Sequence, residues 1–299
     1  MMIYPVKKKI LIPMLGISLL LLACIPRKEP VETLVLSYLV ELPTILQENS
    51  GMIGLGSLIW FHNDGGNEPA LYGYSTEQDS IVNTVVVKDV VNTDWEDITQ
   101  NTDQIYIGDF GNNAAGNRTD LRIFIIKKDD LLMEADTITP SGTISFSYAD
   151  QTDFTPMEEN TSPFDCEAFI ATEDSIFLFT KDWQTLQTRV YSLSVEPGTQ
   201  VAKFRKQWNV SGLITAAVWS AENQELLLLG YTPLFPFIWV FSSFSPEDLS
   251  FTEGKRTDFS SYWGVQTEGI MISSDGTIYV SAERSPTSNA GLYRIEKQH

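Results

Sequence analysis

The sequence has few of the residues from which most zinc and nucleophilic sites are built. It contains two cysteines, Cys24 and Cys166, and two histidines, His62 and His299. If Cys24 carries a lipid, Cys166 has no partner, so no disulfide or cysteine-based metal site is available, and two histidines with one cysteine do not favour zinc. A Ser-His-Asp triad would depend on His62, and no Gly-x-Ser-x-Gly segment is present. The sequence therefore does not indicate a serine hydrolase.

Basic residues are also scarce. The chain has 20 Lys and Arg against 39 Asp and Glu, a formal net charge of −19. Such an acidic surface repels nucleic acid and anionic lipid headgroups. We therefore exclude nucleic acid as a partner and favour a divalent cation, a small-molecule ligand or a protein.

The only long apolar run lies at the N-terminus. It covers residues 10–22, follows Lys7, Lys8 and Lys9, and contains Pro13. It is shorter than the roughly 20 residues that a membrane-spanning helix needs, and its layout is typical of an export signal. We predict a signal peptide over residues 1–23.

The segment after that run is a candidate lipid anchor. Residues 21–24, Leu-Leu-Ala-Cys, resemble the bacterial lipobox, which implies a diacylglyceryl group on Cys24. More than one acyl chain gives stable membrane attachment. We expect a lipidated tether over residues 24–33 that holds the protein at a bacterial cell envelope. Ile25 supplies no acidic inner-membrane retention signal, which favours the outer membrane.

After residue 33 helical periodicity is absent and one pattern recurs. A five-residue segment with a central glutamate and a hydrophobic last residue precedes a turn and a strand at 94–98, 165–169 and 266–270, with weaker copies at 48–52 and 214–218. A third strand follows each pair, and a more polar fourth strand follows four of them. Five units of about 50 residues with four strands each are typical of propeller blades.

The ends of the repeat array predict how the ring closes. The fifth unit lacks a fourth strand, whereas residues 33–42 form a strand that belongs to no unit. Pairing the two would complete the last blade. We predict an all-β protein with a single β-propeller over residues 34–299, with five four-stranded blades preferred and six as the alternative.

Three motifs support this prediction: Trp-Phe-His-Asn-Asp-Gly-Gly at 60–66, Asp-Trp-Glu-Asp-Ile at 94–98 followed by Ile-Gly-Asp-Phe-Gly-Asn-Asn at 107–113, and Phe-Thr-Lys-Asp-Trp at 179–183. Together they resemble a family of extracytoplasmic bacterial propellers with WD40-like or NHL-like repeats, common in Bacteroidetes. The likeness covers most of residues 48–299. It implies a propeller fold outside the cytoplasm and carries no activity with it.

The repeat register also predicts a functional face. Loops that enter the inner strand of each blade share a face with the loops between the second and third strands. These two sets of loops carry the candidate ligand or cation residues, which are Glu48, His62, Asp64, Asp94, Glu96, Asp109, Asn112, Asp165, Glu167, Lys181, Asp182, Glu268 and Glu283. We therefore predict an acidic mouth at one end of the central channel.

Three of these residues recur at an equivalent position in the repeat. They are Glu96, Glu167 and Glu268, which we predict as metal ligands. Ca²⁺ takes six to eight oxygen ligands and suits such a ring better than Zn²⁺ does. The alternative role is structural, in which the glutamates accept hydrogen bonds from backbone N–H groups of neighbouring blades. Recurrence fits both roles.

The sequence supports two classes of function. The first is a lipid-anchored binding or scaffold module that holds Ca²⁺, a small ligand or a protein at the acidic mouth. The second is a propeller hydrolase, glycosidase-like or a calcium-dependent phosphohydrolase, that uses carboxylates at the same face. Trp95 and Trp183 lie near loop ends on that face and are candidates for stacking on a sugar, whereas His62 is expected to cap a strand end.

Overall fold

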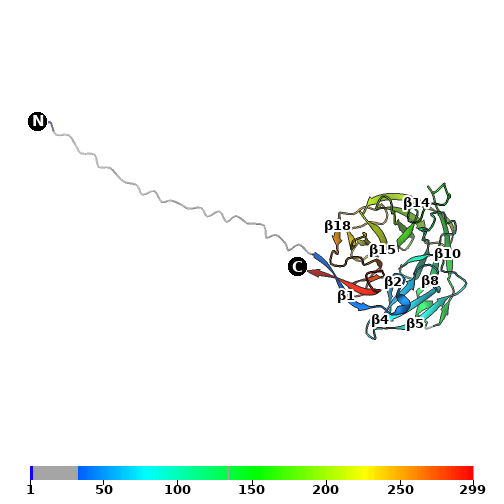
Figure 1. Ribbon diagram of the computed structural model, residues 1–299. Helices are drawn as coiled ribbons and strands as arrows, with labels where there is room; N and C mark the ends of the chain where they lie inside the picture. Colours follow the sequence, from blue (N-terminus) through cyan, green and yellow to red (C-terminus); the bar gives the residue numbers. More distant parts are fainter. Residues whose placement is uncertain (3–32, 134, 299) are drawn as a thin grey trace.

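Strands make up almost all of the regular structure in the computed structural model, which describes residues 1–2, 33–133 and 135–298 (Figure 1). The predicted signal peptide and Cys24 lie outside the described residues, as does all of the predicted tether except Thr33. Within the described part of the chain, no helix has the length and hydrophobicity needed to cross a membrane. Two short helices, η1 (Thr44–Leu46) and α1 (Lys128–Leu132), lie in loops.

The strands form five four-stranded blades. The first consists of β2 (Asn49–Leu55), β3 (Leu58–Asn63), β4 (Ala70–Ser75) and β5 (Ser80–Val87). The second consists of β6 (Trp95–Gln100), β7 (Gln104–Asp109), β8 (Arg122–Lys127) and β10 (Gly142–Tyr148). The third consists of β11 (Cys166–Ala171), β12 (Ser175–Thr180), β13 (Gln187–Ser194) and β14 (Gly198–Asn209). The fourth consists of β15 (Leu213–Ser220), β16 (Glu225–Tyr231), β17 (Pro236–Ser242) and β18 (Glu253–Asp258). The fifth consists of β19 (Thr267–Ile272), β20 (Ile278–Ala282), β21 (Gly291–Gln298) and β1 (Thr33–Glu41).

The N-terminal strand closes the ring as predicted. β1 pairs antiparallel with β21 as the outer strand of the last blade, and each inner strand contacts the next one around the channel, including β19 with β2. Figure 1 shows the blue first strand beside the red last one. The fold is therefore an all-β propeller with five blades rather than six.

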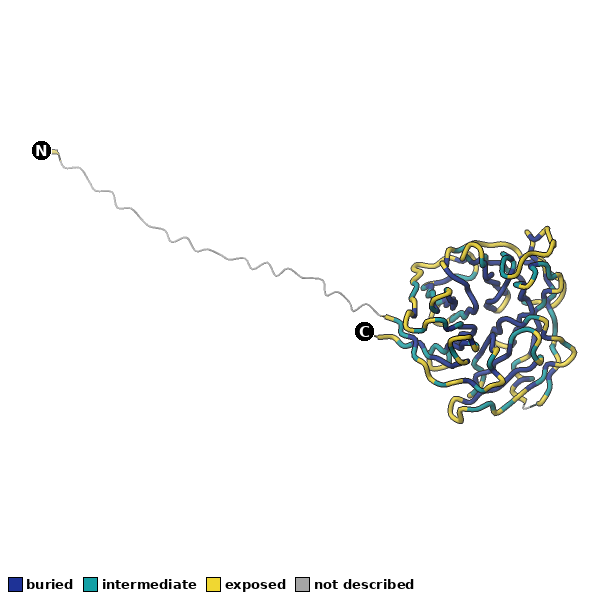
Figure 2. The backbone as a smooth tube through the Cα atoms, in the orientation of Figure 1, coloured by how far each residue is buried: buried dark blue, intermediate teal, exposed yellow. Residues whose placement is uncertain are grey.

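The blades pack face to face, so their middle strands are apolar on both sides. β12 and β16 are buried along almost their whole length, whereas the outer strand β14 is mostly exposed. One hydrophobic cluster fills each interface between neighbouring blades, and Figure 2 shows this buried interior. Trp95 belongs to the cluster between the first two blades and is fully buried, so it does not form a sugar-stacking surface.

Two outer edges depart from a regular propeller. β10 pairs parallel with β14, which joins the second and third blades, and the short strand β9 (Thr137–Ile138) pairs parallel with β5. In the fourth blade the polar segment at 248–252, which the repeat pattern predicts as the outer strand, is a turn instead: Asp248 accepts hydrogen bonds from Ser250 and Leu249 has a φ of 56°. The strand is β18, directly after it.

Strand direction determines which loops share a face. Every inner strand begins at the same end of the channel, where the second strand ends and the third begins. β1 runs the opposite way to β21, since Thr33 lies across from Gln298 and Glu41 across from Gly291. The described propeller therefore begins at the face opposite the predicted mouth.

Candidate functional site

A β-bulge stands at the start of every inner strand, at the same end of the channel. The extra residue in each is Ser50, Glu96, Glu167, Thr215 or Glu268. A bulge interrupts the ladder and turns a side chain out of the regular alternation. The fivefold repeat of this feature places all three predicted glutamates at one mouth.

The hydroxyl members of this set connect neighbouring blades. Ser50 Oγ donates to the carbonyl oxygen of Glu96 at 2.5 Å, and Thr215 Oγ1 donates to that of Thr267 at 2.6 Å. The buried Asp97 has a similar role, because its carboxylate accepts the backbone N–H of Phe169 in the next blade. Asp97 thus makes the kind of contact that the structural alternative assigned to the glutamates, and the two hydroxyls connect neighbouring blades through backbone carbonyls instead.

Two of the glutamates have no such contact. Glu96 is 4% exposed and Glu268 is 7% exposed, and within the described chain neither side chain makes a hydrogen bond or an ion pair. Their carboxylate oxygens are not among the fully buried atoms without a partner, since both residues line the mouth cavity. These two carboxyls are therefore not explained by support of the fold, which favours a ligand-binding role.

Both glutamates line a cavity of about 200 Å³ at the channel mouth. Six of the predicted site residues line it, which are Asp64, Glu96, Glu167, Lys181, Glu268 and Glu283. Asn113, in the loop after residue 109, also lines it, and the sequence analysis did not identify the lining residues Asn49, Ser50, Glu159, Asn160, Tyr231 and Gln266. Tyr231 ends β16, the second strand of its blade, so the repeat register offered a signal for it.

An acidic triad forms one side of this mouth. Oxygen atoms of Asp64, Asp94 and Glu96 all lie within 4.8 Å of one another. Two loop glycines pack directly against them: a Cβ on Gly111 would collide with Glu96 Oε1 and Asp94 Oδ2, and one on Gly65 would collide with Asp94 Oδ1. Oxygen ligands on adaptable loops are the chemistry that Ca²⁺ prefers.

The electrostatics of the triad reflect its crowding. Burial raises the pKa of Asp64 to about 7 and that of Asp94 to about 6, although Arg118, 3.8 Å from Asp94, opposes the second shift. Burial, followed by the charge of Glu167, raises the pKa of Glu96 well above its usual range. The raised pKa values favour the protonated form of these carboxyls, and a bound cation would favour the ionised form.

The other side of the mouth already contains a cation. Lys181 Nζ lies 2.9 Å from Glu167 Oε2, and it sits 5.0 Å from the ring centre of Trp183 and 5.4 Å from that of Tyr231. Burial alone would lower the pKa of Lys181, but the neighbouring Glu167 helps to raise it well above its usual value. The structure thus groups Glu96 with Asp64 and Asp94, while Glu167 faces a lysine. The metal set of Glu96, Glu167 and Glu268 stays a prediction.

Three other predicted residues hold the loop that follows β7. The fully buried Asp109 accepts hydrogen bonds from Arg118 at 2.9 Å and from Arg122 at 3.0 Å. The backbone N–H of Asn112 donates to Asp165 Oδ1 at 2.8 Å, and Asn112 Oδ1 accepts from the backbone of Arg118. This loop carries Gly111 against the acidic triad, so Asp109, Asn112 and Asp165 support the mouth without lining it.

The last three predicted residues also lie away from the cavity lining. His62 is fully buried with its ring edge-on to Trp95, and burial lowers its pKa to about 4, so the imidazole is neutral. Asp182 caps a turn by accepting hydrogen bonds from Thr185, and the exposed Glu48 accepts one from Asn67 at 2.7 Å. The ring contact with Trp95 gives His62 a packing role, and Asp182 and Glu48 stabilise loops.

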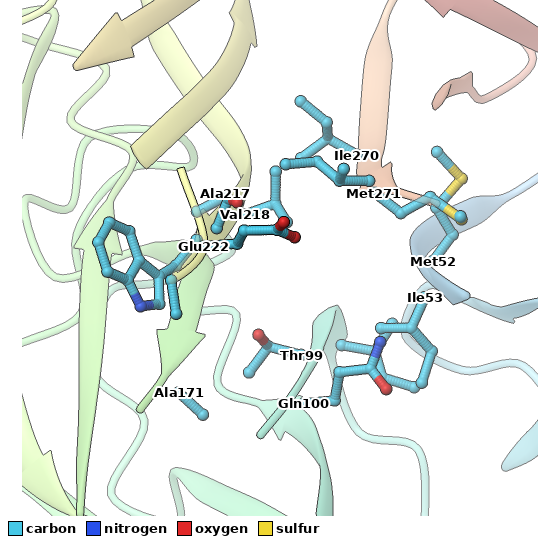
Figure 3. A pocket seen from close by; sticks show the side chains of 15 residues that line it. Met52, Ile53, Thr99, Gln100, Ala171, Ala217, Val218, Glu222, Ile270 and Met271 are labelled. Carbon is cyan, nitrogen blue, oxygen red and sulfur yellow. The ribbon is translucent and has the colours of Figure 1, made fainter. Parts of the chain in front are cut away.

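The opposite end of the channel has different chemistry. Its cavity of about 240 Å³ is lined mainly by aliphatic side chains of the inner strands, among them Met52, Ile53, Ile270 and Met271 (Figure 3). Glu222 is the only titratable side chain among the described residues that line it. Charge is therefore concentrated at one mouth.

Comparison with known proteins supports the fold alone. No protein-family model matches the sequence, and no curated protein matches it. A glucose dehydrogenase structure is 9% identical, with a TM-score of 0.50, and the match covers 88% of this chain and 99% of that one. The soluble aldose sugar dehydrogenase from Escherichia coli in its apo-form is 8% identical with a TM-score of 0.46, covering 89% and 100%. A hydrazine synthase chain from Kuenenia stuttgartiensis is 8% identical with a TM-score of 0.40, and the match covers 81% of this chain and 58% of that one.

Proposed function

We propose that this protein is a cell-envelope binding module, anchored by a lipid on Cys24, whose propeller binds Ca²⁺ at its acidic mouth. The observation that carries the proposal is the triad of Asp64, Asp94 and Glu96, whose oxygens converge within 4.8 Å while Glu96 is buried without a partner in the described chain. A divalent cation offsets the repulsion among these carboxyls, and the cavity beside it leaves coordination positions open to a ligand.

The donor set favours Ca²⁺ over other cations. All three groups are carboxylates, and the one histidine near this face, His62, is buried against Trp95 rather than lining the cavity. Zn²⁺ prefers nitrogen and sulfur ligands, and Mg²⁺ demands a stricter octahedral geometry than loop carboxylates usually supply. Ca²⁺ tolerates irregular geometry and completes its shell with water.

Calorimetry with CaCl₂ on the chain from residue 25 onward tests this site. We expect a dissociation constant of about 10⁻⁴ M, typical of extracellular calcium modules. Asp94→Asn and Glu96→Gln should abolish the heat, whereas Glu222→Gln, at the opposite end of the channel, should not change it. Glu268→Gln tells the triad of Asp64, Asp94 and Glu96 from the predicted metal set of Glu96, Glu167 and Glu268. The variant weakens calcium binding only if the ion is held by the second set. Absence of heat and of any thermal shift up to about 10 mM Ca²⁺ would refute the proposal.

A hydrolase is the second candidate, favoured by the environments of Glu167 and Glu268. Burial, followed by the charge of Glu283, raises the pKa of Glu268 well above its usual value, while the Lys181 ammonium lies 2.9 Å from Glu167. Glycoside hydrolysis uses one protonated and one ionised carboxyl. If the wild type releases nitrophenol from nitrophenyl glycosides and Glu268→Gln does not, the result would support a glycosidase. Bis(4-nitrophenyl) phosphate with Ca²⁺ tests the phosphohydrolase version.

A further inference from the structure

The mouth cavity has a second part beside the acidic triad, on the third, fourth and fifth blades. Lys181, Trp183, Tyr231, Glu268 and Glu283 line it. Glu268 is 93% buried, since its exposed fraction is 7%, and it makes no hydrogen bond or ion pair within the described residues. An unpartnered side chain of this kind at a cavity wall points to a ligand.

This part of the mouth offers unused hydrogen-bond donors. The Lys181 ammonium has three protons and forms one ion pair, with Glu167. Tyr231 Oη accepts from Gln266 Nε2 at 3.4 Å, while its own proton has no acceptor among the described residues. Both side chains are more than nine-tenths buried, so water has limited access to these donors.

It offers acceptors as well. The carboxyl groups of Glu268 and Glu283 accept no hydrogen bond within the described chain, and the lining amides of Asn113, Asn160 and Gln266 can each donate and accept. Donors and acceptors therefore face the same small space. A ligand that fits must present both kinds of group.

The mixture of donors and acceptors narrows the choice. An ammonium group only donates and a carboxylate only accepts, whereas a hydroxyl group does both and can pair with Lys181 as well as with Glu268 and Glu283. We infer that this part of the mouth binds a neutral polyhydroxylated ligand of about one sugar ring. The inference rests on the proposed function in taking the mouth as the ligand site, and it does not require the metal.

Size and an aromatic wall agree with this class of ligand. The cavity of about 200 Å³ corresponds to the bulk volume of about six or seven waters, below the roughly 300 Å³ at which sites for larger ligands begin. Trp183 lines the cavity and is fixed by a hydrogen bond from its indole N–H to Asp165 Oδ2 at 3.3 Å. A rigid indole provides an apolar surface for the C–H face of a sugar ring.

Saturation-transfer difference NMR and calorimetry with free monosaccharides test the inference. The probes are glucose, galactose, mannose, xylose and arabinose, each with Ca²⁺ and with EDTA, with methylammonium and acetate as charged comparators. We expect at least one sugar to bind with a dissociation constant of about 0.1–10 mM, and Tyr231→Phe to weaken it about fivefold. Glu222→Gln should leave binding unchanged. Gln266→Ala serves if Tyr231→Phe fails to fold, as judged by thermal melting.

The outcomes separate the two proposals. Calcium binding without binding of any sugar at 50 mM would overturn this inference and leave the proposed cation site intact. Sugar binding without calcium binding would support this inference and refute the proposed cation site. Binding of methylammonium or acetate in place of every sugar, or a sugar affinity that neither Tyr231→Phe nor Gln266→Ala changes, would also overturn it.

Discussion

Replacing Glu96 with Gln is expected to stabilise the ion-free protein above neutral pH. Glu96 is 4% exposed, and burial, together with the charges of Glu167, Asp64 and Asp94, raises its pKa well above the usual 4.5. The folded protein therefore retains a proton that the unfolded chain loses. Stability from this group is lost as pH rises from about 4.5 toward its folded pKa, at up to about 1.4 kcal/mol per pH unit.

Glutamine has nearly the same shape and no charge to lose. The difference in unfolding free energy between variant and wild type should be small at pH 5 and should grow with pH in favour of the variant, to more than about 1.4 kcal/mol, the equivalent of one pH unit, at pH 8. His62 changes stability in the opposite direction, since its pKa falls from 6.5 to about 4 on folding. Its contribution is the same in both proteins and cancels in the difference.

Guanidinium unfolding at pH 5, 6, 7 and 8 in EDTA measures this profile. Glu222→Gln, an exposed carboxylate at the other end of the channel, is the matched control and should stay within about 0.5 kcal/mol at every pH. Saturating Ca²⁺ should reverse the order, because only the wild type retains all three triad carboxylates. A difference that does not grow with pH would refute the assignment of an unfavourable buried charge to Glu96.

Three further changes have distinct expected results. Gly111→Ala should abolish calcium heat without altering any charge, because its Cβ collides with Glu96 and Asp94; unchanged affinity would show that the loop does not pack tightly on the triad. Thr215→Val should lower unfolding free energy by about 1 kcal/mol and leave calcium binding intact, because it removes only the bond to Thr267. Deleting residues 1–41 should replace the single cooperative melt with broad unfolding or aggregation, since it exposes the edge of β21; a sharp melt at the original temperature would contradict the closure.

The strands that could be predicted from the sequence are those with runs of apolar residues. Second strands such as β12 and β16, the latter with Leu226 to Leu229, are buried on both faces and therefore form continuous apolar runs. The outer strand β18 is polar and largely exposed, so nothing in its composition marks it apart from the preceding turn. Parallel pairing of β10 with β14 depends on how two blades meet, which no local pattern encodes.

The candidate site was predicted to the level of one mouth and no further. Repeat register placed Glu96, Glu167 and Glu268 at equivalent positions, and the bulges show that their backbones are equivalent. Their surroundings differ, because Lys181 reaches Glu167 while Asp64 and Asp94 approach Glu96. Equal places in a repeat do not imply equal neighbours, since each blade has loops of its own length and composition.

With a lipid on Cys24, the starting point of β1 would decide which end of the channel lies nearer the point of attachment. Thr33 lies at the end of β21 that is remote from the loops around Glu283, so a chain that enters there enters at the aliphatic end of the channel. A lipid on Cys24 would then hold the propeller by its base. The acidic mouth would face the solvent, where diffusing ligands can reach it. It would also lie away from the anionic headgroups, which its negative charge would repel.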